Sequence, residues 1–248
     1  MTTGALPVTT LRAGATVLGA YAYVVALLVA GEPVTTIREW LNRPLGLGED
    51  FGPFAIMLLL VCTGYTAAAT GFVARRLVWV CLPALVAAAV AVGNVPLIWV
   101  TVLQVVGWLV ALDRRTWPTT LALLAATGVL CLCSTDLTWL GRPLEFLPLV
   151  LVGHVAWRVR AGTLPSWAGV LLGAACVGAV IGVDDSFPGL GQWWYPVAAT
   201  FAVLLFVAAA RPGATTSAVD AHPVTRGLAA VTEWPILVGP VLVAAVST

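Results

Sequence analysis

Residues 11–31 read LRAGATVLGAYAYVVALLVAG, and the only charge in this stretch is Arg12. A bilayer core of about 30 Å needs roughly 20 apolar residues per helix, so this stretch is long enough to span one. The rest of the chain is similar: 60% of its 248 residues are hydrophobic, 9% are charged, and the mean hydropathy is +1.01. A soluble domain carries about 25% charged residues. We therefore expect an integral membrane protein.

Nine segments of this kind follow one another along the chain, without an internal repeat. They predict an all-α helical bundle in one membrane domain, 1–248, with about nine transmembrane helices. The predicted spans run approximately 11–31, 52–73, 77–93, 95–112, 117–134, 144–159, 166–183, 193–210 and 228–246. Between them we expect an amphipathic connection on the outer surface at 32–51 and a flexible inner linker at 211–227.

The arginines predict the orientation of these spans. With a cytoplasmic N-terminus and nine spans, nine of the twelve arginines fall on the inner side, and only Arg38, Arg43 and Arg142 fall outside. An excess of basic residues in cytoplasmic loops is the usual rule for membrane proteins. The predicted C-terminus is therefore outside.

The composition also excludes several kinds of chemistry. All twelve basic residues are arginine, so a lysine Schiff base and a phosphate-loop lysine are excluded. The net charge of +1 gives no general attraction for nucleic acid. The five cysteines lie in apolar runs without metal-ligand spacing, so we expect no metal site and no covalently bound cofactor.

Arg12 and Tyr23 are expected to share one face of the first helix. Eleven residues at 100° each complete about three turns and rise about 16 Å, which places Tyr23 near the middle of the membrane. A plain structural interpretation is an interfacial arginine below a packed aromatic ring. A functional interpretation depends on the segments that follow.

Three later motifs complete a recognisable order. Thr63-Gly64-Tyr65 ends an apolar run, Arg75-Arg76 with Pro83 lies on the predicted inner side, and Trp99 opens a later span. Together with Arg12, this resembles the bacterial membrane acyltransferase family, whose members O-acetylate envelope and metabolite sugars. The resemblance covers residues 8–112 and implies a multi-pass protein of a bacterial-type plasma (inner) membrane.

The chain departs from the family at reactive positions. Tyr23 occupies the position of the family's catalytic histidine, Trp79 that of a third inner arginine, and Gln104 that of a glutamate. The stretch 233–240, EWPILVGP, lacks the histidine expected near the end of the family pattern. Acyl transfer to a hydroxyl needs a base, and a tyrosine, with an ordinary pKa of about 10, is a poor base near pH 7.

The resemblance implies an O-acyltransferase that moves an acyl group from cytoplasmic acyl-CoA to a hydroxyl of an envelope or metabolite acceptor. Arg12, Arg75 and Arg76 would then bind the donor's phosphates, although the positive-inside rule alone predicts the same arginines. The alternative is a non-catalytic scaffold or partner subunit that has lost its base. A transporter or lipid-binding protein is the third possibility. The sequence leaves enzymatic activity, acceptor and oligomeric state open.

Two further ionisable residues are candidates for the missing base. His154 is an intramembrane histidine and Glu233 an intramembrane carboxylate, and such groups are functional candidates by default. For His154 a hydrogen-bonded structural role is the competing interpretation. The candidate catalytic set is therefore Tyr23, Gln104, His154 and Glu233.

Overall fold

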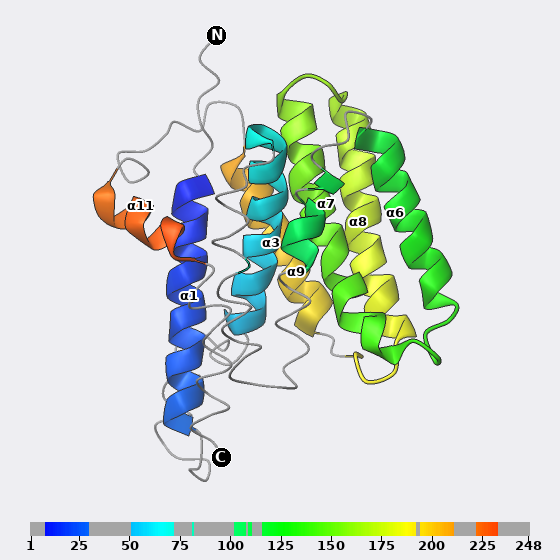
Figure 1. Ribbon diagram of the computed structural model, residues 1–248, viewed down its shortest axis with the longest axis horizontal. Helices are drawn as coiled ribbons and strands as arrows, with labels where there is room; N and C mark the ends of the chain where they lie inside the picture. The colour runs from blue at the N-terminus through cyan, green and yellow to red at the C-terminus, as the bar shows by residue number, and fades with distance from the viewer. Residues whose placement is uncertain are drawn as a thin grey trace.

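The computed structural model describes residues 8–29, 51–71, 81, 102–107, 109–110, 116–191, 194–210 and 222–232. Within these ranges the protein is a bundle of helices without a strand (Figure 1), which confirms the predicted all-α class. Its helices are α1 (Val8–Val29), α3 (Phe51–Thr70), α6 (Thr116–Cys131), the 3-10 turn η2 (Thr138–Leu140), α7 (Gly141–Arg160), α8 (Ser166–Ser186), α9 (Trp194–Ala209) and α11 (Pro223–Ala230).

Short connections make α6, α7 and α8 alternate in direction (Figure 1). The turn between α7 and α8 is closed by the carbonyl of Arg158, which accepts hydrogen bonds from the amides of Thr163 at 3.0 Å and Leu164 at 3.2 Å. Gly162 has a φ of 73°, a left-handed conformation that glycine adopts without a Cβ clash. Because these links are too short to cross the bundle, successive helices must lie antiparallel.

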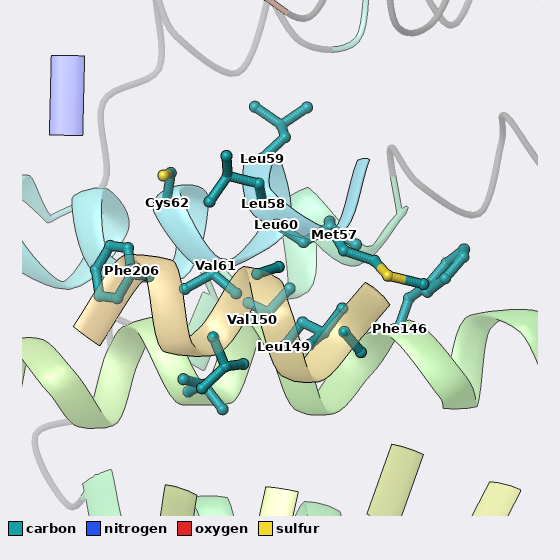
Figure 2. Packing of buried hydrophobic residues seen from close by; sticks show 14 of the residues in the cluster. Met57, Leu58, Leu59, Leu60, Val61, Cys62, Phe146, Leu149, Val150 and Phe206 are labelled. Carbon is teal, nitrogen blue, oxygen red and sulfur yellow. The ribbon is translucent and has the colours of Figure 1, made fainter. Parts of the chain in front are cut away.

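Helix α7 is the centre of the described bundle and packs against α3, α8, α9 and α6. Its middle turns, from Leu149 to Val152, are buried, and they join the buried run Met57–Cys62 of α3 in one apolar cluster. Figure 2 shows this cluster, with Phe206 of α9 among its members.

Two glycines let α3 and α7 cross at backbone contact. A Cβ on Gly64 would overlap the backbone carbonyl of Val150, and a Cβ on Gly153 would overlap the carbonyl of Val61 and lie 2.6 Å from the amide nitrogen of Tyr65. No larger residue fits at either position at this helix separation. Small residues at such crossings are the usual packing device of membrane helices.

Two described helices are long and apolar enough to cross a membrane: α3 from Pro53 to Thr70, and α8. Helices α6 and α9 are also apolar but shorter. Helix α8 turns much of its apolar surface outward: Val170 is 71% exposed and Leu171 is 62% exposed. An exposed apolar face of this kind marks a surface that meets lipid or another protein.

The helices begin and end near the predicted spans where both are described, with one addition. Helix α11 begins at Pro223, inside the stretch predicted as linker. The side chain of His222 accepts a hydrogen bond from the amide of Val224 and so caps the helix, while Pro223 supplies the fixed φ suited to a first turn. The predicted connection 32–51, the span 77–93 and most of the spans 95–112 and 228–246 lie outside the described residues.

Candidate functional site at the arginine-bearing end

Four described arginines lie at one end of the bundle, which we call the arginine-bearing end: Arg12 of α1, Arg158 and Arg160 of α7, and Arg226 of α11. Arg12 lies within electrostatic reach of Cys62 of α3, and Arg160 lies within reach of Tyr65, one turn further along the same helix. Both arginines therefore lie near the same part of α3, one on α1 and the other on α7.

That turn of α3 carries the Thr63-Gly64-Tyr65 motif. The ring of Tyr65 meets Trp157 edge-on at a centroid distance of 5.4 Å and meets Phe206 at 5.5 Å. Edge-to-face aromatic pairs of this kind contribute beyond their buried area. Together with the crossing at Gly64, these contacts give two of the motif's residues a packing role.

Arg160 also joins α7 to α9. Its guanidinium donates a long hydrogen bond, 3.5 Å, to the carbonyl of Ala210, just beyond the end of α9. The last carbonyls of a helix carry partial negative charge, so a cation is favourable there.

Arg12 is buried, with 8% of its surface exposed. Its backbone carbonyl accepts hydrogen bonds from the hydroxyls of Thr16 at 3.0 Å and Thr232 at 3.2 Å. Thr232 follows α11, so a segment near the other end of the sequence packs onto the turn of α1 that holds Arg12. The resemblance implied a donor-binding residue open to the inner face, and in this structure Arg12 is covered.

Gln104 lies in the helical segment 102–107 and is completely buried. Gly107, one turn later, faces Val150, and a Cβ on it would lie 2.7 Å from Cγ1 of that valine, so the segment packs on the middle of α7. Neither side-chain oxygen nor nitrogen of Gln104 has a hydrogen-bond partner within the described part of the chain. Leaving a buried amide in that state costs about 1–3 kcal/mol.

His154 and Glu145 are both buried on α7, with exposures of 1% and 0%. They are nine residues apart, which is two and a half helical turns and a rise of about 14 Å. The two side chains therefore leave opposite sides of α7 at different depths. They do not form an acid–base pair with each other.

Helix α1 carries Arg12 and Tyr23 in one uninterrupted helix. The side chain of Tyr23 lies outside the described residues, as do Arg75, Arg76, Trp79 and Glu233. The structure thus places Arg12, Gln104 and His154 of the predicted set. Among the described residues, no group of three His, Cys, Asp or Glu side chains is arranged to hold a metal ion.

Thr16 and Thr232, which join α1 to the C-terminal part of the chain, were not predicted from the sequence. Their separation of 216 positions gives a local pattern nothing to detect. Gly153 was not predicted either, although it lies at the same helix crossing as Gly64 and allows the same close backbone contact. A search for glycines on neighbouring apolar helices would have found that pair.

No protein-family model, no curated protein and no solved structure matches this chain. The acyltransferase resemblance accordingly stays a prediction that rests on the order of Arg12, Thr63-Gly64-Tyr65, Arg75-Arg76 and Trp99.

Proposed function

We propose that the protein is a multi-pass protein of a bacterial-type plasma membrane, with the arginine-bearing end in the cytoplasm and about nine spans. Two features support this orientation. The long described helices α6, α7, α8 and α9 alternate in direction (Figure 1). Arg12, Arg158, Arg160 and Arg226 gather at one end, as the positive-inside rule requires, whereas Arg142 lies at the other end of α7. The exposed apolar face of α8 suits contact with lipid tails.

Within that membrane the proposed activity is transfer of an acyl group from cytoplasmic acyl-CoA to a hydroxyl of an envelope or metabolite acceptor. The observation that carries this proposal is that two arginines from different helices, Arg12 and Arg160, lie near the part of α3 that holds Cys62 and Tyr65. Guanidinium groups bind phosphates through two parallel hydrogen bonds, and the donor is the phosphate-rich reactant. Arg75 and Arg76 would extend the set.

A second candidate is a non-catalytic relative that binds the donor or a partner without transferring the acyl group. Gln104 favours this candidate because an amide, buried and without a described partner, stands where the family has a carboxylate. An amide neither takes a proton at neutral pH nor balances the charge of a protonated base. His154 is 1% exposed and on the opposite side of α7 from Glu145, so no described carboxylate on its own helix supports it as a substitute base.

The test is acyl-CoA binding and turnover by protein purified into lipid nanodiscs. Under the proposal, Arg12→Met weakens acyl-CoA binding at least about tenfold, since it keeps the apolar stem and removes the charge. Arg226→Met is the matched control because Arg226 is exposed on α11 at the same end. If both variants bind acyl-CoA as the wild type does, the donor site is not at Arg12.

Turnover separates the two candidates. Wild-type protein that releases CoA thiol and acylates an acceptor is an enzyme, and His154→Gln then tests the substitute base. Wild-type protein that binds acyl-CoA without turnover supports the non-catalytic candidate. In that case Tyr23→His, which restores the family's base, is expected to produce activity.

A further inference from the structure

Helix α11 lies crosswise beside the N-terminal half of α1 (Figure 1), and α1 is its principal neighbour. The helix has eight residues and two different faces. Ala229 is buried against the bundle, and Thr232 just beyond the helix is completely buried, whereas Val224 and Arg226 are exposed. So short a helix is marginal in water alone and depends on its contacts for stability.

The contact between α11 and α1 includes two threonine hydroxyls, those of Thr16 and Thr232, which we call the threonine latch. The hydroxyls lie 2.7 Å apart. That of Thr16 is also 3.0 Å from the carbonyl of Leu228 in α11, and that of Thr232 is 3.2 Å from the carbonyl of Arg12 in α1. Each hydroxyl thus reaches a backbone carbonyl of the opposite segment.

The latch closes on the turn of α1 that carries Arg12. The Arg12 side chain is 8% exposed in this arrangement, and Thr16, one turn further, is 3% exposed. An anionic ligand needs direct access to the guanidinium, because a bidentate contact requires two of its N–H groups at hydrogen-bond distance. At this exposure of Arg12, the phosphates of a cytoplasmic donor have little such access.

We propose that α11 is a lid over Arg12, held shut by the threonine latch, and that acyl-CoA reaches Arg12 only when the latch opens. This rests on the proposed function for the identity of the ligand, but the movement of the lid can be observed without it. The latch suits such a device because hydroxyl hydrogen bonds are individually weak and re-form without rearrangement of the core. An apolar joint such as that between Gly64 and Gly153 would not release so readily.

A reversible disulfide tests the lid directly. The variant Thr16→Cys with Thr232→Cys places two thiols where the hydroxyl oxygens now lie 2.7 Å apart, and a disulfide needs its two sulfur atoms about 2 Å apart. Oxidation locks α11 onto α1, and a reductant releases it. Wild-type protein taken through the same oxidation controls for its five native cysteines.

Access to Arg12 is then measured with phenylglyoxal, which modifies guanidinium groups, followed by peptide mass spectrometry. The lid predicts protection of Arg12 in the locked form and modification in the reduced form. Arg226 is exposed and serves as an internal control, expected to react equally in both forms. Equal modification of Arg12 in the locked and reduced forms overturns the lid.

The donor is added in a separate arm. In the reduced form, acyl-CoA is expected to protect Arg12 from phenylglyoxal, and in the locked form it is expected not to bind. If the disulfide protects Arg12 from phenylglyoxal but acyl-CoA does not, the lid proposal stands and the proposed function is contradicted. Acyl-CoA binding to the locked form as tightly as to the reduced form overturns the lid.

A second pair of variants covers a disulfide that fails to form. Thr16→Val with Thr232→Val keeps the shape of the side chains and removes both hydroxyls, so modification of Arg12 is expected to be about three- to tenfold faster, the effect of roughly one hydrogen bond on an opening equilibrium. Thr16→Ser with Thr232→Ser keeps the hydroxyls and is expected to resemble the wild type. No change in rate with the valine pair contradicts the latch.

Discussion

The α3–α7 crossing and the α1–α11 contact join helices in opposite ways. At the crossing, Gly64 and Gly153 bring two backbones into direct contact over an apolar cluster. At the contact with α11, two helices are held by the hydroxyls of Thr16 and Thr232. Lipid tails are as apolar as leucine, so membrane helices associate by close packing or by polar bonds rather than by exclusion from water. We expect the first kind of joint to stay closed and the second, which depends on hydrogen bonds, to open more readily.

The largest expected effect is at the crossing. Gly153→Ala places a methyl group against the carbonyl of Val61 and the amide of Tyr65, so α3 and α7 must separate. We expect a loss of about 3 kcal/mol or more in the free energy of unfolding, because neither backbone can yield. Denaturation in mixed detergent micelles, followed by circular dichroism, measures it. An unchanged midpoint would show that the helices do not meet at this glycine.

The aromatic contacts beside the crossing come next. Tyr65→Leu removes the edge-on pairs with Trp157 and Phe206 while keeping a bulky apolar side chain. The expected loss is about 2 kcal/mol, since each such pair contributes about 0.5–1.5 kcal/mol. Tyr65→Phe keeps the ring and both of its aromatic contacts, and its loss of stability in the same denaturation assay should be much smaller. Equal losses for the two variants would assign the effect to the hydroxyl instead.

The threonine latch is expected to contribute less. Thr232→Val removes its hydrogen bonds at nearly constant volume, and we expect a loss of about 1 kcal/mol, confined to α11. Hydrogen exchange should increase in 223–232 and stay unchanged in α7. Thr200→Val is the matched control because the hydroxyl of Thr200 donates to the carbonyl of Pro196 within its own helix, at 2.8 Å. Faster exchange in α7 as well would mean that α11 supports the whole bundle.

The smallest effect is expected on the outer face of α8. A Cβ on Gly178 would meet nothing within 4 Å, so Gly178→Ala adds a methyl group without a clash. Alanine is the better helix former, and stability should rise by about 0.5 kcal/mol or remain unchanged. This variant is the control for Gly153→Ala, made by the same chemical change on the neighbouring helix. A clear loss of stability would reveal a partner on this face.

Hydropathy is sufficient to locate the long helices, because burial in lipid and burial in protein both select apolar residues. The predicted span 166–183 corresponds to α8, Ser166–Ser186, and 193–210 corresponds to α9, Trp194–Ala209. Hydropathy does not reveal which helix is central. Helix α7 is surrounded by its neighbours although it carries Glu145, His154 and three arginines.

The candidate site is less accessible to sequence reasoning. A helical repeat can place Arg12 and Tyr23 on one face of α1, but it cannot show that a segment 216 positions after Thr16 will pack onto the turn that carries Arg12. Likewise, the resemblance singled out Thr63-Gly64-Tyr65 from the sequence. The structure adds a packing reason for two of these residues: Gly64 allows the close helix crossing, and the ring of Tyr65 packs edge-on against Trp157. Both the burial of Arg12 and the packing of Gly64 and Tyr65 depend on contacts between segments that are distant in the sequence.

The tight turn between α7 and α8 has a consequence for how the chain is assembled during synthesis. Charged residues resist entry into a bilayer, by roughly 2.5–3.5 kcal/mol each at the centre of a helix, and α7 carries several ionisable residues along its length. Helix α8 is strongly apolar, and the bonds to the carbonyl of Arg158 fold it directly back onto α7. If α7 and α8 both span the membrane, as proposed, we expect the translocon to release them into lipid as one hairpin. Insertion of extra residues into 161–165 would then delay the entry of α8 into the membrane, and α7 would remain at the membrane surface.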